Sequence, residues 1–111
     1  MKKINIIKKN YDINNIINQR NMVKNNYFYI YKDKNNYNNY RFAICVSKKI
    51  GNAVIRNKIK RQIRSIISKN DYQNNFNCII IVGRAITERS YQQREENLLI
   101  ALKNINIIKE K

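Results

Sequence analysis

One segment of the chain combines the residue types that bind polyanions. Residues 48–65 read KKIGNAVIRNKIKRQIRS and contain no carboxylate. Arg56, Lys60 and Arg64 follow one another at a spacing of four residues, where like charges on a helix repel by a few tenths of a kcal/mol, roughly, for each pair. Because this segment contains no carboxylate to relieve the repulsion among its cations, we expect an anion from outside the protein to bind there. Guanidinium groups suit bidentate phosphate contacts, and Asn57 could reach a base edge or a sugar hydroxyl.

The same segment predicts an amphipathic helix from Ala53 to Ser68, with Asn52 as its N-cap after Gly51. At about 100° per residue, one sector of roughly 120° on the helical wheel contains five isoleucines: Ile55, Ile59, Ile63, Ile66 and Ile67. The opposite side holds Asn57, Lys60, Arg61 and Arg64, with Arg56 at the border. We therefore expect one side to pack against a sheet and the other to bind phosphates. Lys48 and Lys49 add charge before the helix N-terminus, which itself favours anions.

The composition of the whole chain fits a nucleic-acid-binding domain. The 111 residues predict a single domain, 1–111, and a hydrophobic content of 43% is that of a globular protein. A formal charge of +16 favours a polyanionic partner, either nucleic acid or an anionic membrane surface. The sequence shows no signal peptide and no apolar run long enough to span a membrane, so a cytoplasmic protein is expected.

The sequence predicts no catalytic residue and no metal site on the protein. Histidine is absent, and the two cysteines, Cys45 and Cys78, lie far apart within apolar runs, where we expect two buried free thiols. The seven carboxylates are scattered, whereas a two-metal nuclease needs carboxylates that converge. No glycine-rich phosphate loop is present.

Three strands are expected from the apolar patterns. Residues 27–32 and 40–47 alternate between two faces, and we expect them to pair as a hairpin across the Asn-rich loop at 35–39. Residues 78–82 are apolar throughout and predict a central strand. A short extra strand after Ser47 is a further possibility, which would change the element order from αββαβα to αβββαβα.

Two more helices complete the predicted fold. Residues 12–20 place isoleucines at helical spacing, and Ser90 with Gln93 forms a capping box before a last helix. The apolar stripe of this last helix consists of Leu98, Leu99, Leu102 and Ile105. The expected fold class is α+β, a small sandwich with the helices on one face of the sheet.

A second candidate surface is the tyrosine face of the first strand. Tyr27, Tyr29 and Tyr31 share this face, and the neighbouring strand offers the small side chains of Ala43, Cys45 and Ser47. Unpaired bases could stack there, at about 1–3 kcal/mol per base and with little dependence on sequence. For Tyr27 and Tyr29, an ordinary half-buried sheet face is an equally good interpretation.

KKIGNAVIRNKIKRQIRS resembles the signature of the protein subunit of bacterial ribonuclease P. In that family an Arg-Asn-x-x-Lys-Arg-x-x-Arg helix follows a Lys-Lys-x-Gly-Asn-Ala-Val turn, and residues 56–64 fill every defined position. The flanking segments KKNYDINNII, YFYIY, RFAICVS and CIIIVGRA resemble the family's first helix and its strands. The resemblance implies a four-stranded sheet with three helices, similar to domain 2 of ribosomal protein S5, with a left-handed βαβ crossover.

The resemblance also implies a function. An RNA subunit holds Mg2+ and hydrolyses precursor tRNA to free the mature 5′ end, and the protein, which binds no cofactor alone, assists by binding both RNAs. The residues implied for the RNA subunit are Lys48, Arg56, Asn57, Lys60, Arg61 and Arg64. Those implied for the 5′ leader are Lys9, Ile13, Ile17, Tyr31, Ser47, Lys49 and Arg84, and no membrane or obligate protein partner is expected.

The sequence departs from the family pattern at the wall of the leader cleft. The family usually has Phe at the positions of Ile13 and Ile17, so these residues either give apolar contact only or belong to the core. Cys45 stands where the family has a Ser-like residue, and Arg84 is a single cation where a basic pair is commoner.

Other functions remain open from the sequence. A ribosomal or assembly protein could use the same basic helix on RNA without any role in cleavage. A magnesium nuclease acting without RNA would depend on a carboxylate such as Asp71. A membrane-surface role is weaker, because the apolar side of the basic helix is expected to lie in the core.

Overall fold

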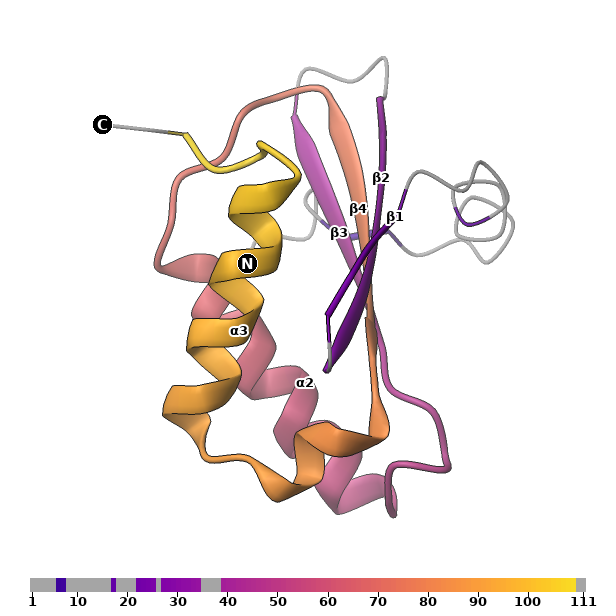
Figure 1. The fold of residues 1–111 in the computed structure, drawn as a ribbon. Coiled ribbons are helices and arrows are strands. Elements are labelled where there is room, and N and C mark those ends of the chain that lie inside the picture. Colours follow the sequence, from indigo (N-terminus) through magenta and orange to yellow (C-terminus); the bar gives the residue numbers. More distant parts are fainter. Residues whose placement is uncertain (1–5, 8–16, 18–21, 26, 35–38, 110–111) are drawn as a thin grey trace.

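The computed structural model describes residues 6–7, 17, 22–25, 27–34 and 39–109 (Figure 1). The strands are β1 (Met22–Lys24), β2 (Phe28–Lys34), β3 (Tyr40–Cys45) and β4 (Phe76–Val82). The helices are α2 (Ala53–Ser68), the short 3-10 helix η2 (Arg84–Glu88) and α3 (Tyr91–Asn104). The helix predicted at 12–20 lies outside the described residues, apart from Ile17, which is helical.

The four strands form one mixed sheet in the order β1-β2-β4-β3. β4 pairs antiparallel with β2 and parallel with β3, so that Ile80 lies opposite both Ile30 and Ile44. The predicted hairpin between 27–32 and 40–47 is therefore wrong, since β4 lies between the two strands. β4 is almost entirely buried, and the central position covers its apolar side chains on both faces. Its prediction as a central strand is confirmed.

The fourth strand comes from a segment that the sequence pattern did not indicate. β1 precedes β2 and pairs with it antiparallel, with Val23 opposite Ile30. The residues after Ser47 form a turn instead of an extra strand, with the Ile50 amide donating to the Ser47 carbonyl at 3.1 Å. Three residues are too few for a clear alternation of apolar and polar side chains, which is why β1 was missed.

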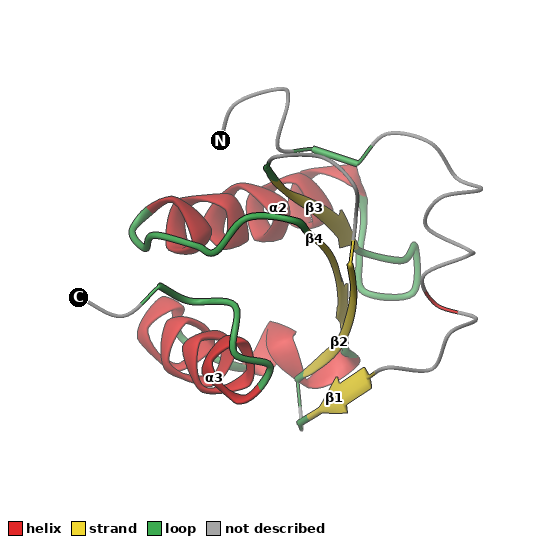
Figure 2. Ribbon diagram, turned by 90° about the horizontal axis from the view of Figure 1, so that it is seen from above, coloured by secondary structure: helices red, strands yellow, loops and turns green. Residues whose placement is uncertain are grey.

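Both long helices cover the same face of the sheet, as Figure 2 shows, and the predicted α+β class is confirmed. The core between the layers joins the α2 isoleucines to Leu98 and Leu102 of α3 and to Phe28, Ile30 and Ile80 of the sheet. Four of the five isoleucines predicted to be buried are buried: Ile59, Ile63, Ile66 and Ile67. Ile55 is 42% exposed, since it lies in the first turn, against Gly51.

The start of α2 explains the glycine at position 51. A Cβ there would lie 3.0 Å from Ile55 Cγ2, a tight contact that the Ile55 side chain would have to relieve by shifting a few tenths of an ångström. Asn52 follows as the N-cap, and its side-chain oxygen accepts from the Ile55 amide at 3.0 Å. At the start of α3, Ser90 and Gln93 form the predicted capping box.

The connection from β3 through α2 to β4 joins two adjacent parallel strands. This confirms a βαβ crossover, while its handedness stays a prediction. None of the described helices is both long and apolar enough to cross a lipid bilayer.

Replacing Asn52 with Ala should lower the free energy of unfolding by about 1 kcal/mol, because the Ile55 amide loses its acceptor. Urea denaturation followed by circular dichroism measures this change. Asn57→Ala, in an exposed position within the same helix, is the matched control and should leave the stability unchanged or slightly higher. Equal losses in both variants would show that the cap contributes nothing.

Candidate RNA interface

The outward side of α2 carries a basic face, which we define as Arg56, Asn57, Lys60, Arg61 and Arg64. Asn57, Arg61 and Arg64 are exposed, while Arg56 and Lys60 are half-buried. Among the described residues none of these four cations has a carboxylate partner. The Arg56 Nε atom is buried and has no hydrogen-bond partner in the same part of the chain. The repulsion along this face is therefore not relieved within the described protein.

Contacts on the opposite flank fix the orientation of this face. Arg94 of α3 donates from Nη1 to the Gln62 side chain at 2.6 Å and from Nε to the Ile86 carbonyl at 3.0 Å. These bonds hold the Gln62 side of α2 against α3, while the buried isoleucines pack on the sheet. The basic face consequently points away from α3 and from the core between helices and sheet.

The face of the sheet opposite the helices presents the second candidate surface. We call it the outer face, and it consists of Tyr29 and Tyr31 of β2, Ile79 and Ile81 of β4, and Ala43 and Cys45 of β3. The strand register aligns these residues in two rows across the sheet, Tyr29-Ile81-Cys45 and Tyr31-Ile79-Ala43. Tyr29, Tyr31, Cys45 and Ile81 are each half-buried and so keep accessible surface.

Ile17 packs on this outer face, in the same apolar cluster as Tyr31 and Cys45. It is half-buried, so it forms a wall of the outer face and is not part of the core between sheet and helices. Its contact with the leader stays a prediction. Ile13, the other candidate wall residue, and Lys9 lie outside the described residues.

Tyr27 does not share the face of Tyr29 and Tyr31, so the prediction that the three tyrosines lie on one face is wrong for Tyr27. It precedes β2 and packs against the core on the helix side, with the Arg89 guanidinium carbon 5.2 Å from its ring centre. The Asn25 side chain accepts from the Tyr27 and Phe28 amides at 2.9 Å, which bends the chain just before the strand begins. Strand alternation therefore does not apply at Tyr27.

The remaining predicted contacts gather at one edge of the sheet. β3 and β4 are parallel, so their carboxyl ends meet at the same edge. Ser47, Lys48 and Lys49 follow β3 and are exposed, and Arg84 follows β4 and is exposed too. α2 begins at Ala53, directly after the same turn, so this edge connects the basic face to the outer face.

Cys45 and Lys60 mark the place where the two surfaces meet. Burial raises the pKa of the Cys45 thiol, and the nearby Lys60 ammonium opposes that rise in pKa. A residue of the basic face thus lies close to a residue of the outer face. Cys78 is fully buried as predicted, but Cys45 is only half-buried, so the prediction of two buried thiols is wrong for Cys45.

Sequence reasoning missed cations that lie over aromatic rings, among them Lys24, Lys69 and Arg89. Lys24 places its ammonium 5.3 Å from the ring centre of Tyr29 on the outer face, and Arg89 covers Tyr27. Lys24 belongs to β1, whose pairing with β2 was not predicted. Only knowledge of that pairing could have indicated the contact.

A helix with unpaired cations beside a sheet face of tyrosines and aliphatic residues defines an RNA-binding protein of the α+β class. The family model of ribonuclease P matches residues 1–106. The chain is 40% identical over 108 residues to the ribonuclease P protein component of Mycoplasma capricolum, covering 95% of this chain and 99% of that one. With the component of Streptococcus gordonii it shares 38% identity over 111 residues, covering 99% of this chain and 93% of that one.

Solved structures agree with the sequence relatives. The Staphylococcus aureus RNase P protein superimposes with a TM-score of 0.87 at 33% identity, covering 95% of this chain and 98% of that one. The Thermotoga maritima RNase P protein superimposes with a TM-score of 0.79 at 27% identity, covering 88% of this chain and 94% of that one. The chain belongs to the ribonuclease P protein family and is thus a subunit of an endoribonuclease holoenzyme that processes tRNA, which confirms the resemblance.

Replacing Lys60 with Gln should slow the alkylation of Cys45 at a given pH. The Lys60 charge stabilises the reactive thiolate, so its removal raises the pKa of the thiol and moves the rate profile to higher pH. Iodoacetamide labelling followed by mass spectrometry across a pH series measures the rate at each cysteine.

Lys58→Gln is the matched control, because Lys58 is exposed and points away from Lys60 on the helical wheel. Identical profiles for the two variants would contradict the proximity of Lys60 and Cys45.

Proposed function

We propose that the basic face of α2 binds the RNA subunit of ribonuclease P while the outer face binds the 5′ leader of precursor tRNA. One observation carries the proposal. The four cations of the basic face have no carboxylate partner in the described part of the chain, and the face adjoins the outer face at Lys60 and Cys45. One protein can therefore contact two RNA segments that lie next to each other.

The contact with the RNA subunit is electrostatic in origin. Arg56, Lys60 and Arg64 form a row along the helix, Asn57 and Arg61 lie beside this row, and Lys48 precedes the helix. Phosphates would supply the counter-charges that the protein lacks there, and guanidinium groups can hold them with paired hydrogen bonds. Each neutralised phosphate makes binding salt-sensitive, because it adds about −0.7 to −0.9 to the slope of the logarithm of the binding constant against the logarithm of the salt concentration.

The leader contact combines stacking with phosphate binding. Tyr31 lies beside Ile79 on the outer face, in the cluster that also contains Ile17 and Ile81, and its half-buried ring could stack on any base. Ser47, Lys49 and Arg84 are exposed at the sheet edge and could bind the backbone of the same strand. Lys9 and Ile13 belong to the proposal as well, from outside the described residues.

The chemistry belongs to the RNA in this proposal. The RNA subunit would hold Mg2+, which stabilises the charge that develops on the cleaved phosphodiester. No three His, Cys, Asp or Glu side chains come together within the described residues. The protein would add positive charge to a polyanionic complex and position the leader, in the cytoplasm and without a membrane or obligate protein partner.

The double substitution Arg61→Ala with Arg64→Ala should weaken binding of the RNA subunit by about a hundredfold or more at moderate salt. Two charge-assisted contacts are lost, each worth roughly 1.5–3 kcal/mol. The slope of the logarithm of the binding constant against the logarithm of the salt concentration should also become less steep by about 1.4–1.8. A filter-binding titration at several salt concentrations measures both quantities.

A double variant with the same charge change, Lys58→Ala with Lys103→Ala, is the control, since both lysines are exposed and lie off the basic face. If this control loses as much affinity and slope as the arginine variant, binding depends on net charge alone and the basic face is not the contact.

Tyr31→Leu should weaken binding of a leader-bearing precursor tRNA to the holoenzyme by about fivefold or more, because leucine fills the position but cannot stack. Affinity for mature tRNA, which has no leader, should stay unchanged. Equal losses for the two RNAs would contradict a leader contact at the outer face.

A further inference from the structure

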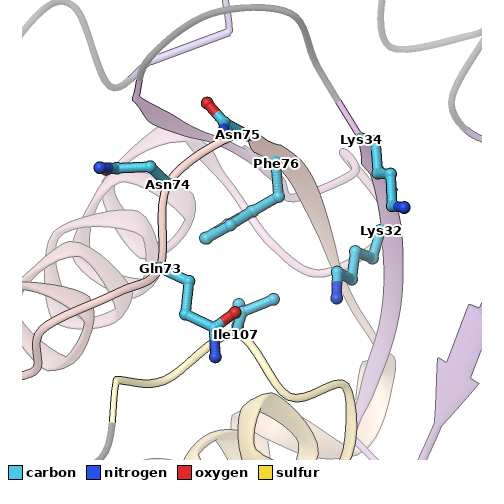
Figure 3. A pocket seen from close by; sticks show the side chains of 7 residues that line it. All are labelled: Lys32, Lys34, Gln73, Asn74, Asn75, Phe76 and Ile107. Atoms are coloured by element: carbon cyan, nitrogen blue, oxygen red, sulfur yellow. The ribbon is translucent and has the colours of Figure 1, made fainter.

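A cavity of about 400 Å³ opens at the end of the sheet where β4 begins. Arg84 and the start of α2 lie at the other end, after the carboxyl ends of β4 and β3. The cavity is thus separate from the basic face and shares no residue with the outer face. Figure 3 shows its seven lining residues, which are Lys32, Lys34, Gln73, Asn74, Asn75, Phe76 and Ile107.

Backbone hydrogen bonds hold the cavity walls in place. The Gln73 amide donates to the Ile107 carbonyl at 3.0 Å, which ties the loop before β4 to the segment after α3. The Asn75 amide donates to the Asn39 carbonyl at 3.0 Å, and Asn75 has a φ of 69°, a conformation that Asn tolerates. Tyr72 and Ile108 form a further bridge beside it. The cavity is therefore largely formed before any ligand binds.

Charged and neutral polar groups face each other across an apolar floor. Figure 3 shows Lys32 and Gln73 reaching toward the middle from opposite walls, with Phe76 and Ile107 between them. Phe76 is 2% exposed and Ile107 fully buried, so both serve as floor. Asn74 and Asn75 turn outward at the rim in the same view.

The charge of the cavity is positive on one wall. Lys32 and Lys34 lie on the same face of β2, about 7 Å apart along the strand, and no carboxylate lines the cavity. Asp33 belongs to the opposite face of the strand. Lys32 donates one hydrogen bond to the Ile105 carbonyl, at 3.1 Å, which leaves two ammonium protons for a ligand.

We propose that this cavity binds one unpaired nucleotide of RNA, separately from the two surfaces described above. Gln73 can both donate and accept at a base edge, Lys32 can donate to a base carbonyl or ring nitrogen, and Lys34 at the rim can hold the phosphate. A volume of about 400 Å³ is at the small end of ligand sites, which suits a single nucleotide. That this nucleotide belongs to an RNA chain rests on the proposed function.

The first test uses free nucleotides and the full chain. In a nuclear magnetic resonance titration, the four nucleoside 5′-monophosphates should shift the Gln73 side-chain amide signals, and inorganic phosphate should not. Gln73→Ala and Lys34→Gln should each weaken nucleotide binding by about fivefold or more, and Lys103→Gln, outside the cavity, should not. Equal shifts with inorganic phosphate would reduce the cavity to an anion site, and the absence of shifts with every nucleotide would overturn the proposal.

The second test decides the source of the nucleotide. Gln73→Ala combined with Lys34→Gln should weaken binding of the RNA subunit by about fivefold or more, relative to Lys103→Gln. Unchanged RNA affinity, together with binding of free nucleotides, would overturn the RNA source and leave a mononucleotide site. The variant carrying Arg61→Ala and Arg64→Ala separates the two proposals, since it should bind free nucleotides normally even where RNA docking fails.

Discussion

The arrangement of the whole molecule depends on β4, a strand that must be covered on both faces. Phe76, Cys78 and Ile80 are buried toward the helices, and Ile79 is buried toward the other side. A strand with apolar side chains on both faces is most stable where a neighbouring strand lies along each of its edges and helps to cover them. β4 accordingly lies between β2 and β3. The helices then cover one face, while on the opposite face Tyr31, Cys45 and Ile81 pack around buried Ile79 and keep part of their surface accessible.

The placement of β4 also sets where the charges lie. Since β3 and β4 are parallel neighbours, the chain must cross over between them, and α2 makes that crossing. The apolar side of α2 packs in the core, its Gln62 flank is held by Arg94, and the remaining side carries the cations. The described ion pair, Lys69 with Glu95, is at the far end of α2 and relieves none of that repulsion. A single helix thereby stabilises the fold and carries the cations that we propose bind RNA.

Local patterns in the sequence predicted local structure well. The bounds of α2, the Asn52 cap and the Ser90–Gln93 capping box depend on contacts within a few residues, and all agree with the structure. The hairpin was wrong because strand pairing depends on a segment that comes some thirty residues later in the sequence. Residues at the ends of elements were misjudged for a similar reason, since Tyr27 and Ile55 lie where strand and helix periodicity stop applying. The neighbours of Cys45, and the cavity, arise only from tertiary packing.

The central claim is that the protein assists cleavage by an RNA subunit and performs none itself. The most direct test is cleavage of a 5′-leader-bearing precursor tRNA at low Mg2+. Purified protein alone, a bacterial ribonuclease P RNA alone, and the two together would be compared. We expect efficient cleavage at the mature 5′ end only with both. Cleavage by the protein alone, or no gain over the RNA alone, would contradict the account.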